Sequence, residues 1–304
     1  MSVDRTQSLP AVGVVILTQG RRPADLRRAI ASVVEQREVD VNVAIVGNGW
    51  DPRQLAGGLP KSVTAVALDE NLGIPAGRNA GVSHVTGEFL FFLDDDASLA
   101  SDGFLRAAIS ILDAAPDIGM LQPQVVDPTG LVSPRRWIPR IRKGSASSPS
   151  NVFSVWEGAV LLRRSVFDAT GGWAAPFFYA HEGIELAWRV WDAGYRAWYA
   201  GDLVANHPVI VQTRHSYYFR LTARNRVWLA KRNLPAAIGA LYVGAWTGVQ
   251  LLRWIRNPPQ RGTGEIRAWF GGWREGWADS AGPRRPLKWS TIWRMTRAGR
   301  PPII

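Results

Sequence analysis

Three consecutive aspartates, Asp94, Asp95 and Asp96, directly follow an apolar run at 89–93. Adjacent carboxylates repel one another, so folding alone gains nothing from such a cluster. In an extended chain Asp94 and Asp96 point to the same side about 6.6 Å apart, and both can then bind one hard divalent cation. Open α/β sheets bind ligands at the carboxyl ends of their strands, which favours a metal site over an ordinary acidic turn.

A glycine-rich segment at 71–81 precedes the aspartates. Its glycines permit a close backbone approach, and Arg78 can make bidentate bonds to a phosphate or a base edge. A glycine-rich helix that packs tightly would have the same composition. The segment is not a P-loop, because no Gly-Lys-Ser/Thr follows it.

A third group of polar residues begins a predicted helix at 181–189. Glu182 and Glu185 lie on one face, and Glu185 is correctly spaced for an ion pair with Arg189. Glu182 stands beside His181, just after an aromatic run at 177–179, which indicates a catalytic carboxylate. Glu185 is explained equally well as a structural partner of Arg189.

The elements that must position these groups alternate between strand and helix over the first 115 residues. This alternation predicts an α/β fold with a mostly parallel sheet. A basic loop is expected at 128–151, including Arg142 and Lys143. We expect strands at 12–17, 41–46, 63–68, 88–93 and 155–162, and helices at 24–36, 75–85, 101–114 with Ser101 as the cap, and 182–193.

The chain has 304 residues, a net charge of +11 and no cysteine. The absence of cysteine excludes a disulfide scaffold, a thiolate zinc site and a cysteine nucleophile. Residues 220–304 contain 16 Lys+Arg, three carboxylates and eight of the 15 tryptophans, for a net charge of +13, whereas residues 1–219 carry −2. We therefore divide the chain into a catalytic domain, 1–232, and a basic, Trp-rich region, 233–304. The uncharged stretch 235–252 is borderline in length for a membrane span, so we expect a helix on protein or at an interface.

The order of these features resembles family 2 glycosyltransferases of the GT-A fold over about residues 11–232. The resemblance rests on strand 12–18, Asn-Leu-Gly at 71–73 with Arg-Asn at 78–79, the Asp-x-Asp at 94–96, the glycines at 158 and 171–172, and the helix start at 181–189. It implies a UDP-sugar donor and Mn²⁺ or Mg²⁺ held by Asp94 and Asp96. His207 falls where several members have a further metal ligand, although a lone histidine is usually structural.

The resemblance also implies two groups of binding residues. On the donor side they are Thr18, Arg21, Asn48, Asn71, Gly73, Arg78 and Asp95. On the acceptor side they are Trp156, Glu157, Gly158, Trp173, His181, Arg224 and Asn225.

The chain departs from the family pattern at two positions. Gly47 occupies the place of an aspartate that contacts uracil, a role that Asp69 or a backbone group could take over. Gly183 occupies the place of the usual catalytic aspartate. The base is then expected to be Glu182, with Glu185 second.

A narrower likeness is to the actinobacterial galactofuranosyltransferase type that starts cell-wall galactan, carried by Asp94–Asp96, residues 181–186 and the tail at 282–286. It implies UDP-galactofuranose and a polyprenyl-diphosphate-linked rhamnosyl-GlcNAc acceptor. A rhamnosyl- or other hexosyltransferase of surface polysaccharide is the main alternative. A nucleic-acid-binding protein is a distant one, since no recognised binding motif is present.

The basic region predicts a peripheral position on the inner, cytoplasmic face of the cell membrane. Tryptophan and tyrosine favour the headgroup level, and clustered Lys and Arg are attracted to anionic lipid. A basic helical appendage with its tryptophans in the core would have the same composition. The residues expected at such a surface are Tyr242, Trp246, Trp254, Trp269, Trp273 and Trp277, with Arg253, Arg256, Arg267 and Arg274.

Overall fold

Four apolar runs form the parallel half of the sheet: β1 (Ala11–Thr18), β2 (Asp40–Asn48), β3 (Val63–Leu68) and β4 (Phe89–Asp94). β1 pairs in parallel with both β2 and β4, and β2 pairs with β3. β1 and β4 have nearly continuous buried runs because helices cover both faces of the sheet. The register sets Leu17 opposite Asp94, so the polar ends of β1, β2 and β4 meet at one edge. The computed structural model describes residues 8–140, 144–209, 215–257 and 263–299.

The second half of the sheet is mixed. Within the described residues the strand order is β3-β2-β1-β4-β8-β6-β9-β5, with β7 paired to β9. β8 runs antiparallel to β4 and β6, and β6 runs parallel to β9. These strands are β5 (Ser98–Leu99), β6 (Ile118–Val126), β7 (Ser150–Val152), β8 (Ala159–Arg163) and β9 (Arg196–Asn206).

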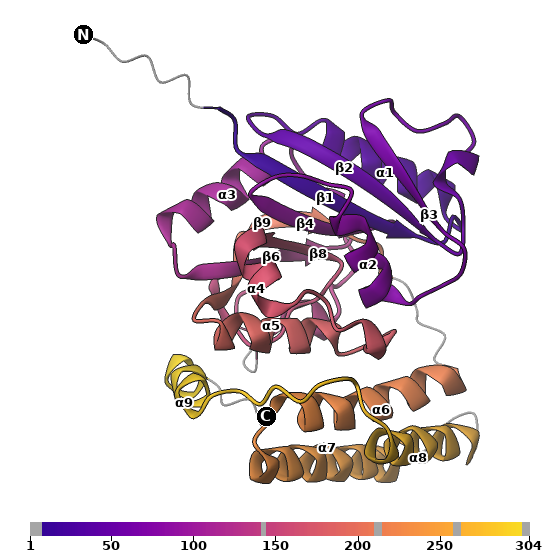
Figure 1. Ribbon diagram of the computed structural model, residues 1–304, viewed down its shortest axis with the longest axis vertical. Helices are drawn as coiled ribbons and strands as arrows, with labels where there is room; N and C mark the ends of the chain where they lie inside the picture. The colour runs from indigo at the N-terminus through magenta and orange to yellow at the C-terminus, as the bar shows by residue number, and fades with distance from the viewer. Residues whose placement is uncertain (1–7, 141–143, 210–214, 258–262, 300–304) are drawn as a thin grey trace.

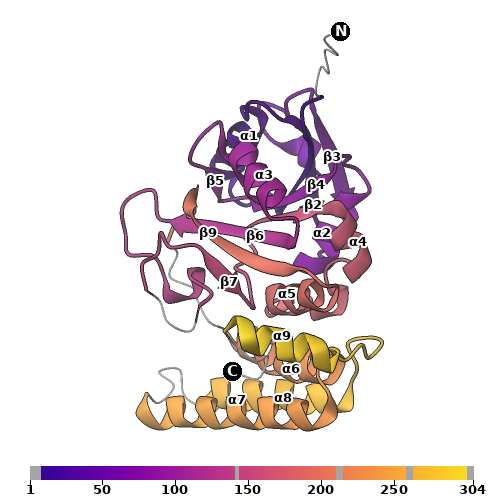
Figure 2. The same ribbon diagram turned by 90° about the vertical axis from the view of Figure 1, so that its left-hand side faces the viewer.

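Helices cover both faces of the sheet (Figures 1 and 2). Side chains of α1 and α3 pack in one hydrophobic cluster, and those of α4 and α5 in the other. α2 lies close to the sheet because a Cβ at Gly81 would meet Val15 Cγ1 at 2.5 Å. The helices are α1 (Pro23–Val34), α2 (Ile74–Val82), α3 (Phe104–Ala114), α4 (Arg164–Thr170) and α5 (Glu182–Asp192), with short 3₁₀ turns η1 (Pro52–Gln54), η2 (Arg135–Trp137) and η3 (Ala175–Phe177).

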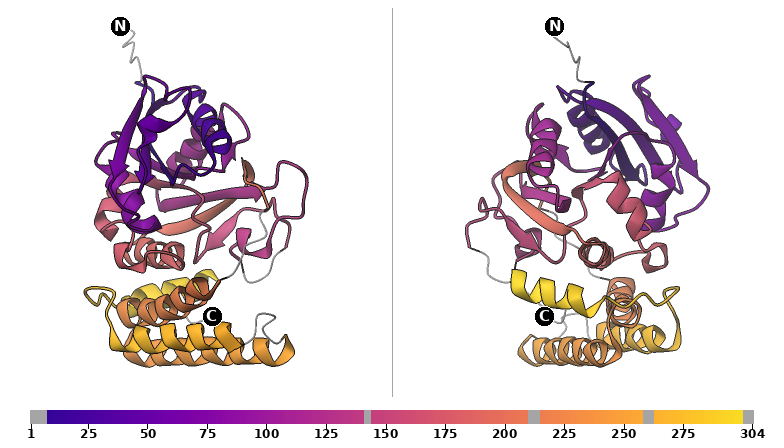
Figure 3. Two further views of the ribbon diagram at one scale, coloured as in Figure 1. Left: turned by 90° about the vertical axis from the view of Figure 1, so that its right-hand side faces the viewer. Right: turned by 60° about the vertical axis from the view of Figure 1, so that its left-hand side comes forward.

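Four further helices form a separate layer beside α5 (Figures 1 and 3). They are α6 (Ser216–Asn233), α7 (Ala236–Arg256), α8 (Thr263–Ala278) and α9 (Trp289–Ala298). α6 and α8 pack backbone to backbone, since a Cβ at Gly272 would lie 2.8 Å from Arg220 Cα. Asp192 at the end of α5 accepts hydrogen bonds from Lys288 N (2.9 Å) and Thr291 Oγ1 (2.8 Å), which joins α9 to the body.

The predicted fold class is confirmed: a central, mostly parallel sheet with helices and a helical C-terminal part. The sequence pattern missed β6 and β9, and the expected strand at 155–162 begins only at Ala159. Ser101 is not the cap of α3, which begins after Gly103 without a side-chain cap.

The basic region also differs in detail from the expectation. α6, which ends at Asn233 beside the expected boundary, packs on α8 of the basic region. Tyr242 and Trp269, expected at a membrane surface, are buried in the packing. In the expected loop at 128–151, Arg142 and Lys143 lie outside the described residues, and β7 occupies its end. Among the described helices, none combines the length and apolarity that crossing a bilayer requires.

Candidate active site

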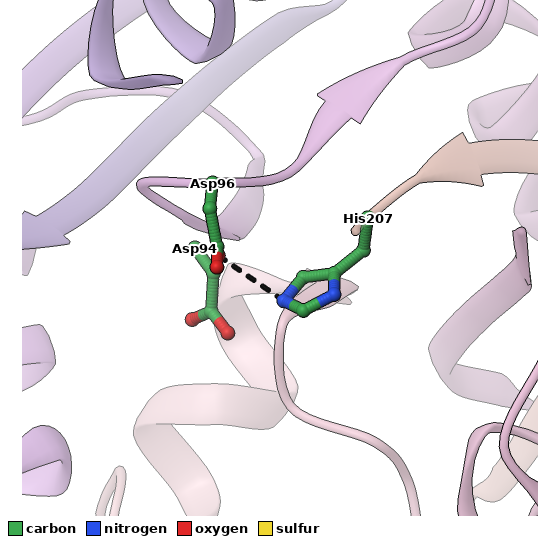
Figure 4. Close-up of side chains that lie close together, drawn as sticks. All are labelled: Asp94, Asp96 and His207. Carbon is green, nitrogen blue, oxygen red and sulfur yellow. Dashed lines mark ion pairs between the residues drawn. The ribbon is translucent and has the colours of Figure 1, made fainter. Parts of the chain in front are cut away.

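The three expected metal ligands lie together (Figure 4). Candidate ligand atoms of Asp94, Asp96 and His207 all lie within 4.8 Å of one another. The pairing of Ser98 in β5 with Asn206 in β9 produces this arrangement, because it brings the residue after β9 beside the loop after β4. His207 Nε2 is 3.1 Å from Asp96 Oδ1.

The chemistry of this donor set fits a divalent cation. Two carboxylates suit Mg²⁺ and Mn²⁺, and an imidazole is a common additional ligand for a transition metal. Burial alone raises the pKa of Asp96, but its hydrogen bond with His207 and the charges of His207 and Arg22 outweigh burial and lower it. Asp96 therefore favours the ionised form that binds metal.

Arg22 is a residue of this site that the sequence analysis missed, having chosen its neighbour Arg21. Its guanidinium is ion-paired with Asp96 and donates to Asp95 Oδ1 at 2.6 Å. Thr18 Oγ1 donates to the other oxygen of Asp95 at 2.6 Å. Burial raises the pKa of Asp95 to about 6, against the opposing effects of Thr18 and Arg22. An arginine just after the first strand, with carboxylates expected at the same sheet edge, was the available signal.

A cavity of ≈600 Å³, here called the carboxylate cavity, opens beside this cluster. Six of the seven predicted donor-side residues line it, and Arg78 is the exception. Arg22, Phe178 and Tyr179 also line this cavity. The six predicted residues that line it are Thr18, Arg21, Asn48, Asn71, Gly73 and Asp95.

A network of amides holds one wall of the carboxylate cavity. Asn48 Nδ2 donates to Asn71 Oδ1 at 2.8 Å, and the backbone N–H of Leu72 donates to Asn48 Oδ1 at 2.8 Å. Gly47, at the place of a uracil-contacting aspartate, has no room for a side chain because its Cβ would meet the Trp50 carbonyl. Asp69, the suggested substitute, is not among the residues that line the cavity within the described chain.

Arg78 lies behind the cluster. It is 2% exposed, donates to Asp94 Oδ1 at 2.7 Å, and its guanidinium lies 4.9 Å from the ring centroid of Trp173. Trp173 is itself buried against Phe92. In this structure Arg78 orients a carboxylate instead of facing the donor-side cavity, and Trp173 packs in the core instead of facing an acceptor.

A second cavity of ≈880 Å³, here called the arginine cavity, lies between the body and the helical layer. Arg226 donates to the hydroxyl of Tyr242 and lies 4.1 Å from the ring centroid of Trp246. Other lining residues are Arg135, Arg136, Arg140, Trp156, Glu157, His181, Trp188 and Arg253. Burial and the charge of Arg226 lower the pKa of His181 well below 6.5, so this histidine is neutral.

The two cavities are separated by residues 178–181. Phe178 and Tyr179 line the carboxylate cavity, whereas His181 lines the arginine cavity. Phe178, Ala180 and His181 all have positive φ angles, which non-glycine residues rarely adopt. Asn225 Nδ2 holds this segment by bonds to the carbonyls of Phe177 (2.8 Å), Tyr179 and Ala180.

Asn225 and Arg224 were expected to bind the acceptor. Asn225 is fully buried with its amide bound to the loop. Arg224 donates to Phe177 O at 3.1 Å and to Glu275 Oε1 at 3.3 Å. Both side chains instead hold residues 177–181 in place.

Two carboxylates lie at the start of α5. Glu182 is 3% exposed, and its Oε2 has no hydrogen-bond partner among the described residues. Burial, followed by the charge of Glu157, raises the pKa of Glu182 to about 8. Burial also raises the pKa of Glu157, against the charge of Arg78. Glu185 is instead part of an ion-pair network, since its Oε1 accepts hydrogen bonds from Arg189 (3.2 Å) and Arg232 (2.8 Å).

Of the remaining predicted acceptor residues, Trp156 and Gly158 are neighbours in space. The Trp156 ring lies 4.9 Å from that of His207 in an edge-on contact. A Cβ at Gly158 would overlap the Trp156 ring, so glycine allows this indole to lie beside the metal-ligand group. The N–H of Asp94 donates to Gly158 O at 2.9 Å, which connects this segment to the acidic cluster.

A mixed sheet with an Asp-x-Asp cluster at the ends of its parallel strands, and a second cavity beside it, defines the GT-A class of glycosyltransferases. The chain belongs to glycosyl transferase family 2, whose sequence profile matches residues 13–171. It is 26% identical over 256 residues to the O-antigen biosynthesis protein RfbC of Myxococcus xanthus. The match covers 74% of this chain and 20% of the relative, so the chain spans about a fifth of that protein's length.

Solved structures show the same fold. A TarS fragment (1–349) from S. aureus has a TM-score of 0.60 at 13% identity, covering 88% of this chain and 80% of that one. GalNAc-T7 with UDP, GalNAc and Mn²⁺ has a TM-score of 0.59 at 15% identity, covering 78% and 50%. The mannosyltransferase PcManGT from Pyrobaculum calidifontis, with GDP-Man and Mn²⁺, has a TM-score of 0.55 at 17% identity, covering 98% and 78%.

Proposed function

We propose that the chain is a metal-dependent inverting glycosyltransferase that moves a hexose from a UDP-sugar to a polyprenyl-diphosphate-linked acceptor. The observation that supports this most is the position of the two cavities, which lie on either side of residues 178–181. Donor and acceptor can then approach each other from opposite sides. Our preferred reaction transfers galactofuranose from UDP-galactofuranose to a rhamnosyl-GlcNAc acceptor in cell-wall galactan synthesis.

The carboxylate cavity is the proposed donor site. Asp94, Asp96 and His207 would hold Mn²⁺ or Mg²⁺, and such an ion neutralises the charge that develops on the departing diphosphate. Arg22, already bound to Asp96, supplies a further positive charge at the same place. Two similar structures support this use of the fold: GalNAc-T7, solved with UDP and Mn²⁺, and TarS, solved with UDP-GlcNAc.

The arginine cavity is the proposed acceptor site. Its arginines match a diphosphate in charge, and its tryptophans match the apolar prenyl chain and the faces of sugar rings. Arg226 and Arg253 both lie over Trp246, at 4.1 and 5.9 Å from the ring centroid. The acceptor hydroxyl would then reach the carboxylates at the start of α5, where we assign proton removal to the Glu157–Glu182 pair.

A rhamnosyl- or other hexosyltransferase of surface polysaccharide is the second candidate. It is favoured by the 26% identity to a protein named for O-antigen biosynthesis. The two candidates differ only in donor sugar and acceptor, because both use the same metal and the same two cavities.

The outer face of α7 is the proposed contact with an anionic membrane, at the inner face of the cell membrane. Leu241, Leu252 and Ile255 repeat on one face and are 66%, 54% and 76% exposed. Arg253 and Arg256 flank them on the same helix. α7 lies on the side of the helical layer that faces away from the sheet (Figure 1).

The membrane contact is tested with the full chain, because deleting α7 and α8 would uncover the faces of α6 that they cover. Leu252→Glu combined with Ile255→Glu should reduce flotation with anionic liposomes. Val132→Glu, at a residue that is 84% exposed on the body, should not. Equal flotation of the wild type, the double variant and Val132→Glu would exclude this face of α7 as the membrane contact.

The reaction is tested by supplying UDP- and dTDP-sugars with Mn²⁺ and a short-prenyl diphosphate disaccharide, followed by linkage analysis of the product. Asp96→Asn should abolish metal-dependent transfer, whereas Asp113→Asn, an exposed change on α3, should retain it. Transfer by Asp96→Asn at the normal rate would contradict the metal assignment. Transfer of rhamnose alone would favour the second candidate.

A further inference from the structure

Gly183 creates the space that Glu157 occupies. A Cβ at position 183 would lie 2.5 Å from Val155 O and closer still to Glu157 Oε1. The N–H of Gly183 donates to that same oxygen at 2.7 Å. A carboxylate from the segment before β8 therefore fills the side-chain position that glycine leaves empty in the first turn of α5.

Glu157 and Glu182 differ in their access to solvent. Glu157 is partly exposed and lines the arginine cavity together with Trp156 and His181. Glu182 is 3% exposed and is not among the residues lining either cavity within the described chain. A molecule in the arginine cavity can therefore touch Glu157, whereas it cannot reach Glu182 without rearrangement.

The buried guanidinium of Arg78 faces this group of carboxylates. Arg78 donates to Asp94, and its charge also stabilises the ionised forms of Glu157 and Glu182. The Nη1 atom of Arg78 is buried and has no hydrogen-bond partner within the part of the chain that the structure describes. Burial and mutual repulsion outweigh the charge of Arg78 and raise the pKa of both Glu157 and Glu182, so two negative charges on this pair are disfavoured.

We propose that Glu157 is the catalytic residue that removes the acceptor proton, and that Glu182 is a positioning residue behind it. This inference rests on the proposed function. The acceptor O–H gives its proton to the Glu157 carboxylate, and the oxygen electron pair forms a bond to the anomeric carbon of the donor. The bond from that carbon to the diphosphate oxygen breaks, and its electron pair leaves with UDP.

The helix start contributes to this role. The N–H of Gly183 holds Glu157 Oε1 in the first turn of α5, where the helix dipole favours a negative charge. Glu182, as a neighbouring carboxyl that retains the proton, keeps a second negative charge from forming. Replacing Glu182 with neutral Gln should therefore change the pH profile only where Glu182 itself ionises, near pH 8, and should change the maximal rate little.

The direct test compares Glu157→Gln with Glu182→Gln in transfer, with binding of UDP and Mn²⁺ as the measure of an intact donor site. Glu157→Gln should lose 10²- to 10⁴-fold in kcat, the usual contribution of a positioned base. Glu182→Gln should lose less than tenfold in kcat, should leave the ascending limb of the pH profile in place, and should remove the inflection that ionisation of Glu182 produces near pH 8. The opposite result, with Glu182→Gln inactive at every pH and Glu157→Gln near normal, would overturn the proposal.

A second pair of variants keeps the test decisive if Glu157→Gln folds poorly. Glu157→Ala should be inactive, whereas Glu157→Asp, which keeps a carboxylate at the same backbone position, should transfer at least tenfold faster than Glu157→Ala. Equal transfer by Glu157→Asp and Glu157→Ala, with both variants still binding UDP, would count against Glu157. A wild-type protein that binds UDP but transfers to no acceptor would instead refute the proposed function.

Discussion

The pH dependence of stability gives the sharpest test of the buried carboxylate at the start of α5. The perturbation is Glu182→Gln, which removes the ionisable group and keeps its shape. Glu182 has a pKa of about 8 in the folded protein, raised by burial and by Glu157 from its ordinary 4.5. A carboxyl with a raised pKa contributes stability that is complete below pH 4.5 and is lost as the pH rises towards 8.

The magnitude follows from linkage. Between pH 5.5 and 7.5 the unfolded chain is ionised at residue 182 and the folded chain is protonated, so wild-type stability falls by about 1.4 kcal/mol per pH unit from this group. Over two units the loss is about 3 kcal/mol. For 304 residues the unfolding entropy near 60 °C is about 0.6 kcal/mol/K. The variant's melting temperature should therefore rise by about 4 °C relative to wild type between the two pH values.

The assay is thermal unfolding of wild type and Glu182→Gln at pH 5.5 and 7.5, at constant ionic strength. Glu35→Gln, an exposed change at the end of α1, is the control and should follow wild type at both pH values. A melting difference between Glu182→Gln and wild type that is the same at both pH values would refute the reasoning. It would mean that Glu182 is ionised in the folded protein.

Three further outcomes are expected. Gly47→Ala should lower the free energy of unfolding by about 2 kcal/mol in urea titrations, because the added Cβ meets the Trp50 carbonyl; an unchanged midpoint would contradict that contact. Asn225→Ala should cost about 2 kcal/mol and increase proteolysis at 177–181, since the carbonyls of Phe177, Tyr179 and Ala180 each lose the bond from the Asn225 amide; stable, protected protein would argue against this anchoring. Arg22→Gln should weaken UDP binding in the presence of Mn²⁺ about tenfold by calorimetry, through loss of a charged hydrogen bond, and unchanged affinity would remove Arg22 from the donor site.

Local sequence patterns were sufficient to predict the four strands of the parallel half of the sheet. Apolar runs that are buried on both sides read as parallel strands, and β1 to β4 lie close to where their sequences indicate. β6 was missed because it contains Gln122 and Pro123, and β9 because small and polar residues interrupt its apolar positions. Both are strands through their pairing with each other, which is a property of the assembled sheet.

The metal-binding role of the acidic cluster could likewise be predicted from sequence, because three adjacent carboxylates after a buried strand repel one another and do not stabilise the fold. Gly47 and Gly183 were the two positions where the resemblance led us to expect a departure from the family pattern. At both positions the sequence shows only that the residue has no side chain. Only the folded structure shows which atoms occupy the space beside each glycine.

Tertiary structure alone decided the partners of these groups. Arg22 reaches Asp96 across 74 residues, and His207 reaches it through the pairing of β5 with β9. Glu157 enters the position that Gly183 leaves open, 26 residues along the chain. Residue types determine which charges a chain carries, but a carboxylate's proton affinity and its access to a cavity depend on burial and on neighbours that are distant in sequence. Only the folded protein specifies those neighbours.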